Sequence, residues 1–445
     1  MRRPVLSRHP QRVVPLAYLA AIAIGTVVLM LPVASADGRG TTFTDAAFTS
    51  VSATTITGLT VVDTATHWSG FGEVVILVLC QIGGLGVMTA TTLLILLVSR
   101  RLGVRSRLIA QTESKALQFG NVRQVVRRVA LLFLVFQGVL AVLLSAAFRL
   151  GYDYPVDTAL WHGVFHSVSA FNNAGFALYS DSLEQFVTDP WVTLPIAIAV
   201  IIGGLGFPVL AELYREWNKP ALWSVTTRLT IGGTVALLAF AWLFVLATEW
   251  TNPDTLGPLS IPQSLLAGFV TAVMPRSGGF AVVPTGELGN DTWLVMDALM
   301  FIGAGSAGTS GGIKVTTFTL LAFVMWAEVQ GEPDVTVGHR RVPYDVQRQA
   351  LTVALAAVGL VAIGTLVLAE TTDFGLDRVL FESVSAFGTT GLSTGITPDL
   401  PTSGQWVLMV LMFLGRVGTI TAAAALALTT RHRLYRLPEE RVIVG

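Results

Sequence analysis

Four short loops built around a glycine carry the residues of this chain that are best suited to chemistry. Glycine tolerates positive backbone dihedrals, so successive backbone carbonyls in such a loop can all face one axis. Rings of carbonyl oxygens can replace the hydration shell of a permeating ion. The candidate ion-binding residues are Ile56, Thr57 and Gly58; Asn173, Ala174 and Gly175; Ser277, Gly278 and Gly279; and Thr389, Thr390 and Gly391.

One such glycine by itself would more often serve close packing between membrane helices. Four glycines in the same register favour a common role instead. The loops contain no carboxylate, which argues against a cation pore built from rings of acidic side chains. We therefore expect a monovalent ion, with potassium as the leading candidate.

The surroundings of the four loops are repeated as well. The sequence Ser-Val-Ser-Ala occurs at 50–53, 167–170 and 383–386, each copy ending five residues before a loop glycine, with a degenerate fourth copy at 271–274. A phenylalanine lies ten residues before each glycine: Phe48, Phe165, Phe269 and Phe381. A second glycine follows 24 to 28 residues later, where we expect it to interrupt the next span: Gly83, Gly203, Gly303 and Gly415.

The elements that position these loops are membrane helices. The chain is 53% hydrophobic and 13% charged, outside the range of soluble globular proteins. Hydropathy predicts eight spans, near 14–33, 74–98, 129–148, 191–213, 227–248, 293–325, 347–369 and 405–428. We expect an all-α integral membrane protein with four tandem repeats, 1–110, 111–220, 221–340 and 341–445. Each repeat consists of a span, a pore helix, a filter loop and a span around one central pore.

The segment before each loop is too short to cross a bilayer, which predicts four re-entrant pore helices. Asp45, Asp157 and Asp377 are expected caps, and the third half-helix opens around Ser260 with Pro262 just inside. Non-helical backbone at membrane depth is tolerated where it lines a water-filled cavity. The negative ends of four helix dipoles would favour a cation there.

The distribution of charged residues predicts how the chain is oriented in the membrane. Basic residues cluster at 2–12, 100–107, 123–128, 215–219, 340–341 and 431–436, whereas most acidic residues fall in the alternate loops. The positive-inside rule then places both termini in the cytoplasm of a multi-pass plasma (inner) membrane protein. The N-terminal apolar run is too long for a signal peptide and predicts a retained first helix. Cys80 is the only cysteine, so no disulfide framework or thiolate metal site is expected.

A gate is predicted at the inner side of the filter. The span at 293–325 is too long for one uninterrupted crossing and contains a run of small residues at 303–312. We interpret this run as an intramembrane plug, with close packing of small residues as the alternative. Arg416 lies within the last span, where a charge is costly unless it faces the cavity or a partner. We expect it to oppose cation passage, with a structural bond to backbone carbonyls as the alternative. The candidate gate residues are Gly305, Ser306, Thr309, Ser310, Gly311, Gly312, Lys314 and Arg416, although Lys314 could also snorkel toward the cytoplasm.

These motifs resemble the Trk/Ktr/HKT superfamily of potassium transporters, specifically the KtrB-type pore subunit, along nearly the full length. The supporting segments besides the loops are 81–86, 171–176, 311–314, 415–418 and 438–441. The short basic tail before the first span favours the Ktr type over the Trk type. The third filter departs from the family's usual Arg-Thr-Ala-Gly, since Gly278 adds a second glycine.

The resemblance implies potassium uptake, with the glycine-rich loop as gate. Channel-like transport and transport coupled to sodium both stay open from the sequence. A glycine in all four filters goes with potassium selectivity in that family. The resemblance also implies a homodimer regulated by cytoplasmic KtrA-type subunits that bind ATP, ADP or a related nucleotide, since no nucleotide-binding motif occurs in this chain. Candidate contacts are the segments 100–128, 330–348 and 431–445. Membrane lipid is an expected partner; nucleic acid and an organic cofactor are not.

Two other classes compete with this interpretation. A sodium-coupled solute symporter also uses broken helices near the midplane, but it would show two inverted halves rather than four parallel units. An intramembrane enzyme would need a metal-ligand pair or a nucleophile with its base, and no such pair stands out. His162 and His166 lie one helical turn apart, where packing or capping is a better explanation than a metal site.

Overall fold

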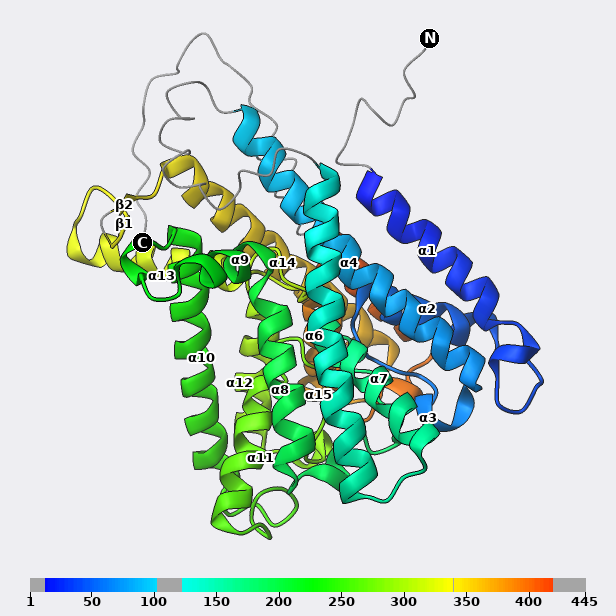
Figure 1. The fold of residues 1–445 in the computed structure, drawn as a ribbon. Helices are drawn as coiled ribbons and strands as arrows, with labels where there is room; N and C mark the ends of the chain where they lie inside the picture. The colour runs from blue at the N-terminus through cyan, green and yellow to red at the C-terminus, as the bar shows by residue number, and fades with distance from the viewer. Residues whose placement is uncertain (1–12, 102–121, 339, 419–445) are drawn as a thin grey trace, which may run out of the picture.

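The computed structural model describes residues 13–101, 122–338 and 340–418, and regular structure in these residues is almost entirely helical (Figure 1). The main helices are α1 (Val13–Leu29), α2 (Phe43–Thr55), α3 (Thr64–His67), α4 (Gly70–Arg101), α6 (Val122–Gly151), α7 (Val156–Asn172), α8 (Pro190–Leu205), α9 (Phe207–Glu216), α10 (Val225–Glu249), α11 (Ile261–Val273), α12 (Asn290–Ile302), α13 (Val315–Gln330), α14 (Tyr344–Thr371), α15 (Leu376–Gly388) and α16 (Thr402–Phe413). A short π-helix, Leu414–Gly418, continues α16. Most of 100–128, the tail 431–445 and the end of the span predicted at 405–428 lie outside the described residues.

Several helices match the dimensions of a bilayer. In the described residues, α4, α6, α10 and α14 are long and apolar enough to cross a membrane, and the bent pair α8–α9 would make a fifth crossing. The 25 residues of α10, for example, exceed the roughly 20 needed for the hydrocarbon core. Large apolar side chains such as Val142, Leu134 and Leu355 are exposed on these helices, as expected where lipid is the solvent. The chain is a multi-pass membrane protein.

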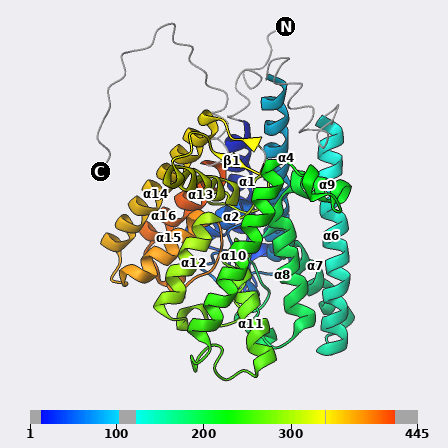
Figure 2. The same cartoon turned by 90° about the vertical axis from the view of Figure 1, so that its left-hand side faces the viewer.

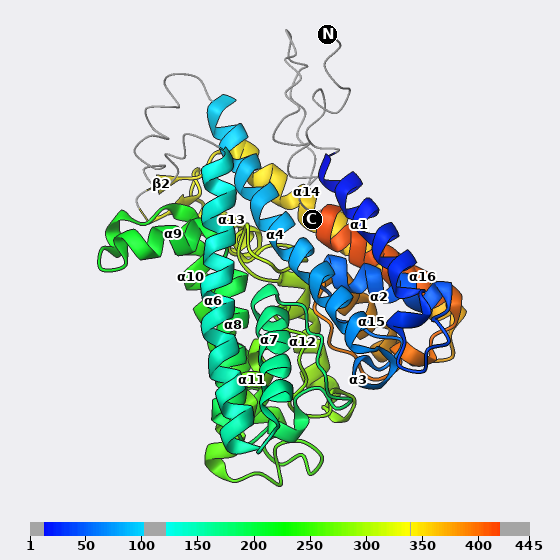
Figure 3. The same ribbon diagram turned by 45° about the vertical axis from the view of Figure 1, so that its right-hand side comes forward.

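The span predicted at 191–213 is wrong as a single helix. The chain breaks at Gly206 and bends by 99° into α9 (Figure 3). Gly206 has a φ of 90°, and Pro208 follows one residue inside the new helix. A proline has no N–H to donate to the preceding turn and clashes with it, so a helix cannot continue regularly through Pro208, and only glycine adopts that φ readily. We refer to the bend between Leu205 and Phe207 as the elbow.

The span predicted at 293–325 also divides, as expected from its small residues. Helix α12 ends at Ile302 and α13 begins at Val315. Gly303 has a φ of 60° and a ψ of −148°, a combination that essentially only glycine adopts. We refer to residues 303–314 as the buried loop, since almost all of these residues are shielded from solvent.

The expectation that a second glycine interrupts each following span is wrong for Gly83 and Gly203, which lie inside α4 and α8. These glycines instead permit close contact with the C-terminal end of a neighbouring helix. A Cβ on Gly83 would lie 2.2 Å from the Thr54 carbonyl oxygen, and one on Gly203 would lie 2.1 Å from that of Phe171. Gly415 meets the carbonyl of Phe387 in the same way, at 1.8 Å. Each carbonyl belongs to the residue four positions before a loop glycine.

The short helices α2, α7, α11 and α15 each pack against two or more other helices (Figure 2). Helix α2 contacts α1, α4 and α16, while α7 contacts α6 and α8; α11 contacts α10 and α8, and α15 contacts α14, α16 and α12. Phe48, Phe165 and Phe381 are fully buried at their centres. With 13 to 17 residues, none of the four reaches the length of a crossing.

The predicted caps of the short helices are only partly right. Ser260 forms a capping box with Gln263, and Pro262 lies in the first turn, as expected. The acidic residues predicted as caps lie inside the first turn instead, because Thr42, Pro155 and Gly375 occupy the N-cap positions. Carboxylates in the first turn still favour the helix through its dipole.

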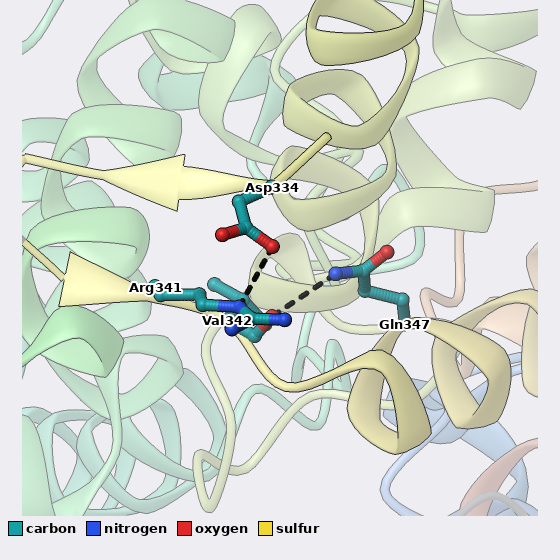
Figure 4. Close-up of polar contacts among 4 residues, drawn as sticks. All are labelled: Asp334, Arg341, Val342 and Gln347. Carbon is teal, nitrogen blue, oxygen red and sulfur yellow. Dashed lines mark hydrogen bonds and ion pairs between the residues drawn. The ribbon is translucent and has the colours of Figure 1, made fainter. Parts of the chain in front are cut away.

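A small antiparallel hairpin joins α13 to α14. Its strands are β1 (Thr336–Val337) and β2 (Arg340–Arg341). Arg341 pairs with Asp334 at 2.8 Å, and the Gln347 amide donates to the Val342 carbonyl at 3.0 Å (Figure 4). The ion pair is exposed and contributes little to stability. Val335 and Val342 pack with residues of α10 and α13, which fixes the hairpin to the helices.

Candidate functional site

The four glycine loops share one backbone conformation. Two residues before each glycine, the φ angle is positive although the residue is not glycine: Ile56 (59°), Asn173 (61°), Ser277 (66°) and Thr389 (47°). The glycines have φ angles of 89°, 70°, 74° and 93°, and the residue between the two has a negative φ. A β-branched residue such as Ile56 rarely adopts this conformation, which costs about 1–3 kcal/mol. The same strained pattern in four places indicates a common requirement.

The loops contact one another in a closed ring. A Cβ added to any of the four glycines would come within 3 Å of an atom of the next loop, well inside normal contact distance. The nearest atoms are the Ala174 carbonyl oxygen for Gly58 at 2.4 Å, the Gly279 Cα for Gly175 at 2.9 Å, the Thr390 carbonyl oxygen for Gly279 at 2.3 Å and the Thr57 carbonyl oxygen for Gly391 at 2.2 Å. The ring therefore brings together all the candidate ion-binding loops and excludes side chains at the glycine positions.

Serine hydroxyl groups form hydrogen bonds with the backbone of three of the loops. Ser52 accepts the Gly58 N–H at 3.0 Å and Ser385 accepts the Gly391 N–H at 3.2 Å. Ser169 donates to the Phe176 carbonyl at 2.7 Å. These are the second serines of the Ser-Val-Ser-Ala copies, whose spacing marks the repeat but whose role the sequence analysis did not identify. The third loop has Val273 at this position.

Two further buried side chains support the segments that follow the glycines. His166 donates from Nδ1 to the His162 carbonyl at 2.8 Å, so its Nε2 is free to accept the Leu178 N–H at 3.3 Å. The Glu382 carboxylate accepts from Ser393 at 2.6 Å and from Thr397 at 2.7 Å. His166 thus has a packing and hydrogen-bonding role. A carboxylate inside a predicted pore helix was the signal in the sequence that could have identified Glu382.

A cavity of about 350 Å³ opens to solvent on one side of the ring. All four loop glycines line it, together with Asp63, Asp181 and Glu184. Ser180 donates to the Asp63 carboxylate at 2.6 Å, which joins the segments after the first two loops. Burial, reinforced by the nearby Asp181, raises the pKa of Glu184 to about 7. The acidic lining raises the local concentration of cations.

The buried loop lies against the opposite side of the ring. The Thr309 hydroxyl donates to the Asn173 side chain at 3.1 Å, and a Cβ on Gly311 would lie 2.3 Å from the Thr389 hydroxyl. Asn173 and Thr389 each lie two residues before a loop glycine, whereas the cavity is lined by the glycines and the residues that follow them. Backbone hydrogen bonds fix the buried loop to α8, from Gly305 to Gly204 at 2.9 Å and from Thr309 to Gly203 at 3.2 Å.

Internal hydrogen bonds stabilise the remaining predicted gate residues. Ser310 accepts the Ala304 N–H at 2.7 Å, and the Ser306 and Thr316 hydroxyl groups pair at 2.6 Å. The Lys314 ammonium donates to the Ser310 carbonyl at 2.5 Å and to the Gly311 carbonyl at 3.3 Å. Lys314 therefore folds back onto the buried loop instead of snorkelling. Gly312 has a φ of 65° and completes the turn into α13.

Arg416 is 1% exposed and lies in the π-helix that follows α16. Its Nη1 donates to the Thr309 carbonyl, so the guanidinium touches the buried loop. The Tyr18 hydroxyl lies beside the guanidinium, while Nε and Nη2 find no partner with good hydrogen-bond geometry among the described residues. Such a group is costly unless it faces an aqueous path or a charged species. Arg416 thus contacts Thr309 of the buried loop, and Thr309 in turn contacts Asn173 of the ring.

A bundle of apolar helices that closes four strained loops over an acidic, solvent-open cavity defines a membrane protein of the cation-transport class. The chain belongs to the TrkH family of cation transport proteins, whose family model matches residues 3–432. This assignment confirms the resemblance seen in the sequence. It also agrees with the expectation of a transporter and not an enzyme.

Curated relatives cover the chain almost completely. Ktr system potassium uptake protein B of Bacillus subtilis strain 168 is 37% identical over 436 residues, covering 98% of this chain and 97% of the relative. The protein of the same name from Vibrio alginolyticus is 35% identical, covering 98% and 94%. Potassium/sodium uptake protein NtpJ of Enterococcus hirae is 31% identical, covering 100% and 99%. The crystal structure of the potassium transporter TrkH from Vibrio parahaemolyticus shares the fold, with a TM-score of 0.73 at 19% identity, covering 94% of this chain and 86% of that one.

Proposed function

We propose that this protein takes up potassium ions across the bacterial plasma membrane through the ring of four glycine loops. The closed ring at the base of an acidic cavity is the observation that carries this proposal. Carbonyl oxygens of the twelve loop residues, from Ile56 to Gly391, would replace water around the ion. The names of the relatives that cover the whole chain support potassium as the ion.

The finer architecture belongs to the same proposal. Helices α2, α7, α11 and α15 would be the re-entrant pore helices of four tandem repeats with eight spans, divided at 1–110, 111–220, 221–340 and 341–445. Both termini would be cytoplasmic, with the 350 Å³ cavity facing outward. Each of the four short helices is followed by a loop with the same backbone conformation, which supports this arrangement.

The buried loop and Arg416 would form the gate. Together they occupy the side of the ring opposite the cavity, and the Arg416 guanidinium holds the Thr309 carbonyl. A fixed positive charge beneath the ring opposes a permeating cation. Regulation by a cytoplasmic nucleotide-binding subunit, assembly as a homodimer and a contribution of sodium are further parts of this proposal. The name of NtpJ, a potassium/sodium uptake protein, supports the last.

Uptake of ⁸⁶Rb⁺ by a bacterial host without its own potassium-uptake systems tests the proposed function. We expect the protein to restore growth at submillimolar potassium and to carry rubidium in competition with potassium but not with choline. Co-expression with a nucleotide-binding subunit from the same genome provides the regulated form. Absence of uptake in both forms, with the protein present in the membrane, would overturn the proposal.

Glu184 gives the cavity a pH dependence. Its pKa of about 7 means that the carboxylate is neutral below pH 7 and negative above it. One charge acting through water over a Debye length changes the energy of a cation by roughly 0.4 kcal/mol. We therefore expect uptake at subsaturating potassium to rise about two-fold as the external pH increases from 6 to 8. Glu184→Gln should remove this increase, whereas Asp399→Asn, a change at an exposed carboxylate outside the cavity, should retain it. A Glu184→Gln variant with the original pH profile would contradict the assignment.

A further inference from the structure

Arg276 is a buried charge that the proposed filter and gate do not use. It directly precedes the third loop and is 4% exposed. Within the described residues no carboxylate forms an ion pair with it. An arginine at membrane depth is costly, and it typically marks a functional position or binds backbone carbonyls. The backbone carbonyls that Arg276 binds therefore suggest its role.

The guanidinium joins two distant elements. Nη2 donates to the Gly303 carbonyl at 3.1 Å. Nη1 donates to the Thr234 carbonyl at 3.3 Å, and Nη2 lies 3.4 Å from the Thr234 hydroxyl. Thr234 belongs to α10, which is a continuous helix. One side of the guanidinium is thus attached to a fixed helix and the other to the start of the buried loop.

Gly303 is the residue at which the chain leaves α12 and enters the buried loop. Its backbone conformation is accessible essentially to glycine alone, and a Cβ there would lie 2.3 Å from the Gly311 carbonyl oxygen. The Gly303 carbonyl cannot be displaced far without losing the Arg276 hydrogen bond. Movement of the buried loop is therefore transmitted to residue 276.

The next residue connects this contact to the ring. The Ser277 hydroxyl donates to the Gly388 carbonyl at 3.1 Å, at the end of α15. Ser277 has a positive φ and lies two residues before Gly279, which touches Thr390 of the fourth loop. A displacement of Arg276 thus alters the backbone at the junction between the third and fourth loops.

We propose that Arg276 is a positioning residue that couples the buried loop to the third loop of the ring. With the loop in place, the guanidinium holds Gly303 and keeps Ser277 in its strained conformation. When the loop moves, the bond to Gly303 breaks and the third loop relaxes. This inference rests on the proposed roles of the ring as filter and of the buried loop as gate.

Ion fluxes into proteoliposomes made from the purified full-length protein test the coupling. The rate of ⁸⁶Rb⁺ influx reports the gate, and the ratio of ⁸⁶Rb⁺ to ²²Na⁺ influx reports the filter. We expect Arg276→Gln to raise the rate and to lower the ratio, each about ten-fold, the change that loss of one charged hydrogen bond brings. Two matched controls should stay within about two-fold on both measurements. Arg378→Gln removes an exposed arginine next to Trp293, and Thr234→Val removes only the hydroxyl contact.

A double variant separates coupling from a general structural defect. With residues 305–311 deleted, the gate is absent, so adding Arg276→Gln should change the rate by less than two-fold while still lowering the ratio. If the deletion and Arg276→Gln instead multiply in their effects on the influx rate, the proposed coupling is wrong, although the buried loop can still be the gate. If the deletion by itself leaves the rate unchanged, the gate and the coupling both fail. Should Arg276→Gln not yield monodisperse protein, Arg276→Lys decides: it keeps the charge but not the forked geometry, and unchanged rate and ratio would overturn the proposal.

Discussion

Deletion of residues 305–311 is expected to increase potassium flux at least ten-fold. It removes Thr309, whose carbonyl accepts from Arg416 and whose hydroxyl donates to Asn173. A hydrogen bond to a charged group contributes about 1.5–3 kcal/mol, which corresponds to roughly 10- to 150-fold in the ratio of open to closed states. Influx of ⁸⁶Rb⁺ into proteoliposomes measures the effect.

The structure indicates that the shortened chain can still close. The Ile313 N–H donates to the Phe301 carbonyl at 3.1 Å, and the Val315 N–H donates to the Ala304 carbonyl at 2.9 Å. The ends of the deleted segment are therefore already neighbours, and α12 and α13 can keep their positions. Ser306→Ala removes one hydroxyl contact between the loop and Thr316 of α13 and should leave the flux within three-fold. A folded deletion variant with unchanged or reduced flux would show that the buried loop is not a gate.

Gly58→Ser is expected to reduce the discrimination between potassium and sodium about ten-fold. A Cβ at this position would lie 2.4 Å from the Ala174 carbonyl oxygen and 3.1 Å from the Gly175 Cα. The φ of 89° adds strain for any residue except glycine. Serine must therefore push the second loop away from the first, which displaces a carbonyl that the ion would bind. The ratio of ⁸⁶Rb⁺ to ²²Na⁺ influx measures the change.

Two control variants identify the cause of this effect. Gly58→Ala introduces the same Cβ without the hydroxyl, so a similar loss would assign the effect to packing. Gly232→Ser makes the same substitution in α10, where a Cβ meets nothing within 4 Å, and should leave discrimination unchanged. If Gly58→Ser retains full discrimination while its flux is normal, the first loop does not select the ion.

The loops were predictable because the ring leaves no room for a Cβ at four positions. That steric requirement appears directly in the sequence as glycine in register, with serine and phenylalanine at fixed distances before it. The break of the span at 293–325 was predictable for a similar reason, since its run of small residues cannot sustain a helix. The strained φ of Ile56 or Thr389 has no such signature, because their side chains are ordinary strand formers and tertiary contacts impose the conformation.

The failures have a common physical origin in contacts between distant segments. Gly83 and Gly203 were expected to interrupt helices, but a glycine that breaks a helix and one that admits a neighbouring carbonyl are identical in sequence. The elbow at Gly206 was missed because apolar residues continue on both sides of it. The role of Arg276 was not predictable from the sequence, since its partners Thr234 and Gly303 lie 42 and 27 residues away.

The ring has a consequence for how such a protein can evolve. Its four loops belong to one polypeptide, so each position is encoded separately and the third loop already differs from the others. A pore made from four identical chains changes all its loops with one mutation. Here a mutation alters a single quarter of the ring. If the ring is the filter that we propose, preference for one ion over another can drift in small, individually tolerated steps.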